Sequence, residues 1–403
     1  MQWRLECLGH SLIEGLASLL PGSWAFRLGE AIGGIAWHFM PQRREIIRRN
    51  LRIAYAGKMQ MEEIEKLVKA TFLRTAANMI SVAHTAKVPA SKLPEVFEVT
   101  NPELLEKTLA PGKGVVFLLS HMGNWELLSR MVHFFPKGTK AGAFYRPLNN
   151  RLLDERVLQR READGTRMFS KGDNFLHVAA YLREGAAVGI LADQRVGKQG
   201  ELTHFFGRLT RSSPLPSLLA RRAKSPVLAI SLVTVSPGKW HATYIPVDGP
   251  PTTENCMRAL ETAMSASPAD VFWFQERWKI YINAQYPIPT WLDDKTSDSN
   301  KRHRALIWLA GAPDGWRVPE VWMHPDVVYE AALPNNFPLP AWLPENTSIH
   351  RVENTDDRDA LRKQLSHIDA ADPLPLDYIL VRKITKAFSK AGKATQIKVV
   401  GLE

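Results

Sequence analysis

The chain contains 403 residues, of which 45% are hydrophobic and 23% are charged, a composition typical of a folded protein with a sizeable core. Its formal net charge is +11, and because residues 301–403 carry 14 basic and 13 acidic side chains, nearly all of the excess lies in the first 300 residues. This excess favours an anionic partner, whether nucleic acid, an anionic membrane or an acidic carrier protein. Two distant cysteines, Cys7 and Cys256, exclude a disulfide framework and a CxxC motif and fit a reducing compartment.

The first 20 residues have the periodicity of an amphipathic helix. Leucines recur there at intervals of three and four, at Leu5, Leu8, Leu12, Leu16 and Leu19. The uncharged runs between Glu14 and Arg27 and over residues 31–42 contain 12 residues each, whereas a spanning helix needs about 20. Glu6 and His10 also interrupt any signal peptide. We therefore expect a helix that lies on a surface and does not span a bilayer.

A basic segment follows at residues 42–58. Against one acidic residue, Glu45, it holds Arg43, Arg44, Arg48, Arg49, Arg52 and Lys58. Such a cluster can bind acidic headgroups, with about 1 kcal/mol for each charge near the surface. The alternative is a solvated helix face beside the core. Because the amphipathic and basic elements adjoin, we predict association with an anionic membrane.

The rest of the first 300 residues alternates between short apolar runs and stretches of helical periodicity. The predicted strands are residues 113–120, 140–146, 186–193, 226–235 and 240–247. The predicted helices lie within residues 124–135, 150–165, 174–185 and 212–224, with Ser213 as the N-cap of the last. This repetition predicts an α/β fold, with a mainly parallel central sheet and helices on both faces. Ligands of such sheets bind at the carboxyl ends of the strands.

His121, in the stretch LLSHMGNWELL, directly follows a predicted strand and precedes a predicted helix. It is therefore expected at the carboxyl edge of the sheet, where a histidine can face a ligand. Glu126, in the first turn of the helix, is within reach of an imidazole N–H, and a histidine oriented by a carboxylate can take a proton from an alcohol. Taken alone, a histidine followed five residues later by an acid is common by chance, and a structural histidine is the alternative.

Longer segments support the catalytic interpretation. They are WHFMPQRREIIRRNLRIAY, GVVFLLSHMGNWELLS, FYRPLNNRLLDERV, GILADQRVGKQGELTHFFGRLTRSSPLPSLLARRAKSPV and VFWFQERWK. In this order they resemble the bacterial lipid A biosynthesis acyltransferases of the lauroyl and myristoyl type, the late acyltransferases, which are related to the mycobacterial mannolipid acyltransferases. The resemblance covers about residues 10–290 and implies a glycerolphosphate-acyltransferase-like fold.

The resemblance also implies roles for single residues. His121 matches the catalytic base that deprotonates an acceptor hydroxyl for direct attack on an acyl thioester, without an acyl-enzyme intermediate. Glu126 matches the acidic member of the same motif, and Asp193 matches an acidic position at another strand end. Either carboxylate can be the one that orients the histidine, and the choice stays open. Arg146 matches a basic position near the active site, where it holds a phosphate or the oxyanion; a surface salt bridge is its alternative role.

Further residues are candidates for substrate binding. They are Asn124, Gln194, Arg195, Ser212 and Ser213, the two serines because backbone N–H groups at a helix start can meet a phosphate. The stretch VGKQGE contains neither GxGxxG nor GxxxxGK[ST], so we interpret it as a loop over the site and not as a nucleotide loop. The aromatic run from Phe272 to Trp278 is interpreted as core. We expect no metal and no cofactor, because the acyl thioester is a co-substrate that is already activated.

The predicted domains follow from these patterns. Residues 1–60 form membrane-associating helices of the acyltransferase domain, and residues 61–293 form its catalytic region. Residues 301–403 follow a polar linker and form a small C-terminal α/β module, to which we assign no chemistry. Its first strand faintly resembles that of a heptosyltransferase, but the loop AGAPDGW departs from that pattern.

The sequence thus predicts an acyltransferase that transfers a fatty acyl chain from acyl carrier protein to a hydroxyl group of a lipid A precursor. The expected location is the cytoplasmic face of the inner membrane, on anionic lipid and with a glycolipid acceptor, and no nucleic acid is expected. Acylation of another glycolipid or of a lysophospholipid, with acyl-CoA as the donor, is the enzymatic alternative. An inactive homologue that binds lipid or a partner is the non-enzymatic alternative. Arg160, Arg161, Arg221 and Arg222 are the predicted contacts with the carrier protein.

Overall fold

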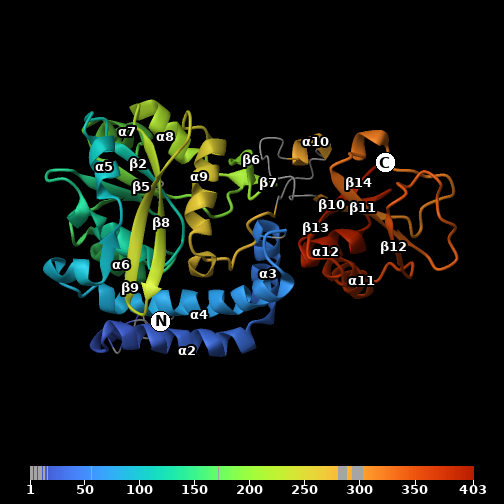
Figure 1. Ribbon diagram of the computed structural model, residues 1–403, viewed down its shortest axis with the longest axis horizontal. Helices are drawn as coiled ribbons and strands as arrows, with labels where there is room; N and C mark the ends of the chain where they lie inside the picture. The colour runs from blue at the N-terminus through green and yellow to red at the C-terminus, as the bar shows by residue number, and fades with distance from the viewer. Residues whose placement is uncertain are drawn as a thin grey trace. The chain divides into compact units, whose positions relative to one another are not determined.

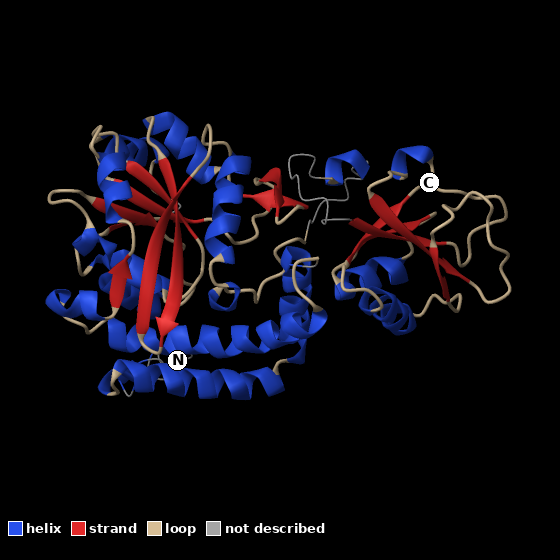
Figure 2. Ribbon diagram, in the orientation of Figure 1, coloured by secondary structure: helices blue, strands red, loops and turns tan. Residues whose placement is uncertain are grey.

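The computed structural model describes residues 3, 7, 11, 14, 15, 17–55, 57–170, 172–279, 288–292 and 303–403. The chain forms two compact units (Figures 1 and 2). Unit 1 comprises Met1–Ile47, Lys66–Phe205 and Arg211–Arg277, and unit 2 comprises Arg48–Glu65, Phe206–Thr210 and Trp278–Glu403. The division into units differs from the predicted domains, because residues 48–65 and 206–210 group with the C-terminal module.

Unit 1 is built on a seven-stranded sheet in the order β1-β9-β8-β2-β5-β3-β4. Its strands are β1 (Phe97–Val99), β2 (Val115–Leu119), β3 (Ala141–Phe144), β4 (Arg167–Phe169), β5 (Ala187–Leu191), β8 (Val227–Ser236) and β9 (Lys239–Pro246). Every pair of neighbours is parallel except β8 and β9, which form an antiparallel hairpin. All five residues of β2 are buried, as expected for a central parallel strand covered on both faces. The predicted mainly parallel α/β fold is confirmed.

Helices flank this sheet in the pattern that the sequence predicts (Figure 2). They are α5 (Pro102–Leu109), α6 (Arg151–Glu162), α7 (Phe175–Arg183), α8 (Leu215–Ala223) and α9 (Thr253–Ser265). Two local predictions are wrong. The segment after His121 is a 3-10 helix, η2 (Trp125–Phe134), and the N-cap of α8 is Pro214, although the Ser213 hydroxyl accepts from the Leu215 N–H at 3.3 Å. A two-stranded hairpin, β6 (Glu201–Phe205) and β7 (Arg208–Ser212), follows the loop VGKQGE.

Within the described part of the chain, the long helices α2 (Gly22–Phe39), α3 (Pro41–Tyr55) and α4 (Met61–Thr85) precede the sheet. In Figure 1, α2 runs alongside α4. Gly29 and Gly33 make this approach possible, because a Cβ at either glycine would collide with the backbone of Ala77 or Phe72 in α4. Of the leucines of the predicted N-terminal helix, Leu5, Leu8, Leu12 and Leu16 lie outside the described residues. Within the described residues, no helix combines the length and the apolar character needed to cross a membrane.

Unit 2 contains a five-stranded parallel sheet in the order β12-β11-β10-β13-β14. The strands are β10 (His303–Trp308), β11 (Val327–Leu333), β12 (Ser348–Arg351), β13 (Leu376–Val381) and β14 (Lys398–Gly401). Leu306 and Trp308 pack with residues of α11 (Arg358–Ala370) and α12 (Lys386–Thr395) on one face, and Ala305 and Ile307 belong to a second cluster on the other. Trp322 of η4 (Glu320–Trp322) belongs to this second cluster, and the ring of Trp291, in α10 (Ile288–Trp291), lies 5.9 Å from that of its member Tyr378. The predicted small C-terminal α/β module is thus confirmed.

The second half of α3 is part of unit 2, and this removes Arg49 and Arg52 from the predicted basic membrane-binding surface, whereas Arg43 and Lys58 are exposed. Arg52 is buried and donates from Nη1 to the Asp369 carboxylate at 2.6 Å and from Nε to the Pro373 carbonyl at 3.0 Å. Arg49 is buried too and donates to the Leu376 carbonyl at 2.6 Å. Both guanidinium groups therefore stabilise the turn between α11 and β13 and are withdrawn from any headgroup.

Candidate active site

His121 and Asp193 meet at the carboxyl edge of the sheet in unit 1. His121 follows β2 and Asp193 follows β5, and the register pairs Leu119 with Leu191, so the two parallel strands end side by side. The distance between His121 Nδ1 and Asp193 Oδ1 is 2.8 Å, and the Asp193 side chain is 2% exposed. A buried carboxylate at this distance fixes the proton on Nδ1 and leaves Nε2 as the basic nitrogen.

The protonation of His121 reflects a competition between burial and charge. Burial lowers the pKa of His121, but the charge and hydrogen bond of Asp193, assisted by the charge of Glu126, outweigh burial and raise the pKa above 6.5. Nε2 lies 3.3 Å from Nε2 of Gln194, and the ring packs edge-on against Trp125 at a centroid distance of 5.3 Å. Nε2 therefore faces the polar end of the cavity described below.

Glu126 takes a different position from the one that the motif suggests. Its carboxylate accepts two hydrogen bonds from Arg161, from Nε at 2.9 Å and from Nη2 at 2.6 Å, and the Arg160 guanidinium lies 3.9 Å away. Burial raises the pKa of Glu126, but the hydrogen bond and charge of Arg161 outweigh burial, and the pKa is lower than usual. The carboxylate that contacts His121 is Asp193, and Glu126 acts on the histidine through its charge.

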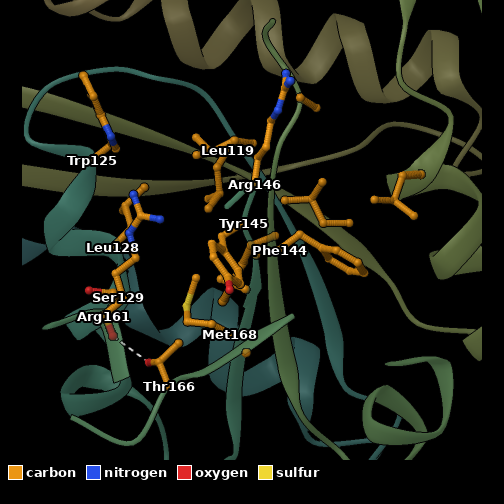
Figure 3. A pocket seen from close by; sticks show the side chains of 18 of the residues that line it. Leu119, Trp125, Leu128, Ser129, Phe144, Tyr145, Arg146, Arg161, Thr166 and Met168 are labelled. Atoms are coloured by element: carbon orange, nitrogen blue, oxygen red, sulfur yellow. Dashed lines mark hydrogen bonds between the residues drawn. The ribbon is translucent and has the colours of Figure 1, made fainter. Parts of the chain in front are cut away.

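A cavity of about 710 Å³ opens beside His121. Its polar end is formed by side chains at the strand ends and on the loops that follow: His121, Trp125, Arg146, Gln194, Arg195 and Ser213. Figure 3 shows Trp125 and Arg146 toward one side of the cavity, and Ser129 and Thr166 toward the other, where the Thr166 hydroxyl donates to the Ser129 carbonyl at 2.6 Å. The volume is within the range of about 300–1,000 Å³ that is usual for ligand sites.

The rest of the lining is mostly apolar along one face of the sheet, although Glu126, Ser129, Arg161, Thr166, Ser170 and Asp173 also line the cavity. Strand register places Ala141, Ala143, Ala187 and Gly189 on the same face as Phe117, Leu119 and His121. These small residues leave space that is closed from the other side by Leu128, Met131 and Val132 of η2 and by Phe135, which follows η2. An apolar slot that begins at a basic nitrogen can hold a hydrocarbon chain with its reactive end at His121.

Two of the predicted substrate-binding residues do not line this cavity. Asn124 is 1% exposed and its Nδ2 donates to the Thr85 hydroxyl at 3.0 Å. Ser212 is fully buried and accepts from the Thr203 hydroxyl at 2.7 Å and from Arg277 Nη2 at 2.9 Å. Both side chains therefore form hydrogen bonds with other segments of the chain and have a structural role. Arg146, Gln194, Arg195 and Ser213 do line the cavity.

The segment Gln275–Arg277, in the motif VFWFQERWK, supports the Asp193 loop, a role that the sequence reasoning missed. Gln275 Oε1 accepts from the Arg195 N–H at 3.2 Å, and Glu276 lies 3.5 Å from the Arg195 guanidinium. Arg277 is 2% exposed, and burial lowers its pKa to about 10 although the charge of Asp193 opposes this. The sequence signal that could have identified this role is the unusual density of charged residues directly after an aromatic run.

The aromatic run itself contacts the site. The Phe272 N–H donates to the His121 carbonyl at 2.8 Å, and the Phe272 ring lies 6.0 Å from that of Trp125. Trp273 is 2% exposed, as the core interpretation predicts. Within the run, Trp273 therefore belongs to the core, and Phe272 supports the backbone at His121.

Comparison with known proteins identifies the family of the chain. The pattern of the family described as bacterial lipid A biosynthesis acyltransferase matches residues 7–280. The lipid A biosynthesis palmitoleoyltransferase of Escherichia coli K12 is 24% identical over 261 residues, which are 62% of this chain and 84% of the relative. The lipid A biosynthesis acyltransferase of Shigella flexneri matches with the same values, and the lauroyltransferase of E. coli K12 is 22% identical over 276 residues, 64% of this chain and 87% of the relative. The chain therefore belongs to the bacterial lipid A biosynthesis acyltransferases and is an acyltransferase.

Proposed function

We propose that the protein transfers a fatty acyl chain from acyl carrier protein to a hydroxyl group of a lipid A precursor, with His121 as the general base. The observation that carries the proposal is the His121–Asp193 pair at the opening of an apolar cavity. Family membership supports the class of acceptor. The relatives are named for lipid A acylation with different acyl chains, and this supports an acyl group as the transferred part.

In the proposed reaction, His121 Nε2 takes the proton of the acceptor hydroxyl while the oxygen attacks the thioester carbonyl carbon. The negative charge of the tetrahedral intermediate develops on the carbonyl oxygen, near the polar end where Arg146 and Gln194 lie. When the intermediate collapses, the carbon–sulfur bond breaks and the imidazolium returns the proton to the leaving thiolate. Asp193 holds the Nδ1 proton and stabilises the imidazolium throughout.

The length of the apolar cavity is expected to set the preferred acyl chain. Ala143→Leu places a larger side chain on the cavity wall formed by β3, beside Gly189. We expect the variant to prefer shorter chains than the parent, because each methylene that cannot enter forfeits about 0.8 kcal/mol of burial, or roughly fourfold in kcat/KM. Competition between carrier proteins loaded with chains of different length measures the preference by mass spectrometry of the product.

Ala110→Leu is the matched control for this variant, because Ala110 is exposed and does not line the cavity. The control is expected to keep the preference of the parent. An Ala143→Leu enzyme that selects the same chain length as the parent would show that the acyl chain binds elsewhere.

The surface available to an acidic carrier protein is smaller than the sequence predicts. Arg161 is paired with Glu126, and Arg160 Nη1 lies 2.6 Å from a Glu14 carboxylate oxygen, so neither side chain is an open docking charge. Arg221 and Arg222, in the last turn of α8, are exposed and keep the proposed role. Acyl-CoA is the alternative donor, and carrier-specific loss of kcat/KM on reversing these two charges favours the carrier protein.

Membrane association at the cytoplasmic face of the inner membrane is proposed to depend chiefly on α2. An exposed apolar stripe runs along this helix at the spacing of one face: Trp24, Leu28, Ile32, Ile35 and Phe39. Trp24 is 64% exposed and Phe39 is 80% exposed, while Phe26, Gly29 and Gly33 on the opposite face are buried. Large apolar side chains in such a contiguous arrangement fit the interface of a lipid bilayer.

Replacing Trp24, Ile35 and Phe39 together by serine is expected to weaken binding to anionic vesicles by tenfold or more, that is, by roughly 1.4 kcal/mol or more, because the inserted apolar area is lost. Sedimentation with vesicles that contain phosphatidylglycerol measures the partition. Leu339→Ser, at an exposed position of unit 2, is the control and should bind as the parent does. Unchanged partitioning of the triple variant would exclude α2 as the contact.

The function itself is tested with purified protein, acyl carrier protein loaded with a fatty acid and an underacylated lipid A precursor, with product detection by mass spectrometry. A mass increase by one acyl group, dependent on His121, supports the proposal. Acylation of a lysophospholipid or another glycolipid in preference to lipid A precursor would support the enzymatic alternative. Binding of the lipid without transfer from either donor would support the inactive homologue.

A further inference from the structure

A second cavity, of about 310 Å³, lies within unit 2 and outside the proposed active site. Its main wall is formed by one face of α12 and by β14. Ser389, Gly392 and Lys393 of α12 are spaced three and four residues apart, and Lys398 is the first residue of β14. Trp278 and Trp291 provide aromatic surface, and Ile53, Leu209 and Ile397 provide aliphatic surface. The cavity is thus large enough for a small ligand and only partly polar.

The charge of this cavity is strongly positive. Its basic residues are Arg49, Arg208, Lys279, Lys393 and Lys398, and Asp377 is the one carboxylate among the described residues that line it. Asp377 accepts from Arg208 Nε at 2.6 Å and lies 3.1 Å from His303. Burial raises the pKa of Asp377, but Arg208 and His303 outweigh burial and lower it to about 2. Arg208 and His303 therefore stabilise the negative charge of Asp377, and basic residues outnumber carboxylates among the described residues that line the cavity.

The ammonium group of Lys398 lies against an aromatic ring and is partly buried. Its ammonium nitrogen lies 3.7 Å from the centre of the Trp291 ring, whose side chain is 7% exposed. Burial lowers the pKa of Lys398 to about 7, because the ammonium loses part of its hydration. An anion that enters the cavity would stabilise this ammonium, and so would be bound more tightly than on an open surface. Lys393, which is exposed, also lines the cavity.

We propose that the cavity of unit 2 binds a phosphate-bearing small molecule, with Lys393 and Lys398 at the phosphate and the tryptophans against the body of the ligand. A phosphate carries up to two negative charges at neutral pH and three acceptor oxygens, which suits several lysines around one space. The hydroxyl of Ser389 and the amide of Gln396 supply neutral hydrogen-bonding groups on the same wall. The site is independent of the acyl-transfer reaction, because all of its residues belong to unit 2.

Titration calorimetry of the full chain with sodium pyrophosphate, at constant ionic strength, tests this proposal. Saturable binding by the parent is expected, with an affinity lowered about tenfold in Lys398→Met and several-fold in Lys393→Met. Methionine keeps the apolar stem of lysine, so the packing against Trp291 is retained. Lys363→Met is the matched control, because Lys363 is exposed on α11 and does not line the cavity.

If Lys398→Met fails to fold, as judged by circular dichroism, the exposed Lys393 carries the test. Absence of saturable binding by the parent, or equal affinities of the parent, both cavity variants and the control, would overturn the proposal. Competition then distinguishes the two sources of phosphate. Displacement of pyrophosphate by adenosine diphosphate supports a soluble nucleotide, and displacement by vesicles that contain phosphatidic acid supports a lipid headgroup.

Discussion

Replacing His121 by alanine is expected to lower kcat for acyl transfer by about 10²- to 10⁴-fold while the protein stays folded. The imidazole is the group whose basic nitrogen faces the cavity, and its other nitrogen is hydrogen-bonded to Asp193. His177→Ala is the control, because His177 is exposed on α7. Rates with saturating donor and acceptor, together with circular dichroism spectra of both variants, measure the effect. Transfer by His121→Ala at a rate near that of the parent would contradict the assignment.

The pH dependence of the parent enzyme gives a second readout of the same residue. The pKa of His121 is raised above 6.5, and a general base must be unprotonated to act. The rate is therefore expected to be full above this pKa and to fall as the pH is lowered through it, with a slope of one proton. A profile that stays flat down to pH 5 would show that the rate-limiting step does not depend on this imidazole.

The position of His121 and Asp193 was predictable from the sequence because it depends on local patterns. Each residue follows a short apolar run, and the carboxyl ends of parallel strands lie at one edge of a sheet. The choice between Asp193 and Glu126 was not predictable in this way. The choice depends on two contacts in the folded chain. Strand β5 is the direct neighbour of β2, and Arg161, which lies 35 positions after Glu126, donates a hydrogen bond to the Glu126 carboxylate.

Other features depend on contacts between distant parts of the chain. Arg49 and Arg52 have the pattern of an exposed basic helix face, yet their partners lie more than 300 residues later, at the end of α11 and the start of β13. Strands β1 and β4 contain three residues each, too few to show a period of two. By contrast, α6 and α8 were predicted closely, because turn residues and helix formers delimit them locally.

Asp193→Asn is expected to lower kcat by about 10²- to 10⁴-fold, because the neutral amide no longer stabilises the imidazolium or fixes the Nδ1 proton. The substitution keeps the size of the side chain, so the loss reports charge and tautomer more than packing. It is also expected to lower the pKa of His121, since Asp193 makes the largest of the contributions that raise it. The acid limb of the pH–rate profile should therefore move to lower pH, an effect that a purely structural residue would not produce.

Glu126→Gln is the informative comparison, because both carboxylates raise the pKa of His121 but Glu126 is bound to Arg161 and not to the histidine. We expect a loss in kcat of about tenfold, a smaller shift of the acid limb than in Asp193→Asn, and lower thermal stability, since a partly buried guanidinium loses its charged partner. Arg161→Lys keeps the charge but not the two parallel hydrogen bonds. It should therefore lower the thermal stability as Glu126→Gln does, with little shift of the acid limb of the pH–rate profile. If Glu126→Gln instead matched Asp193→Asn in both rate and pH profile, Glu126 would be the carboxylate that orients the histidine during the reaction, and the Asp193 contact would serve only to anchor its loop.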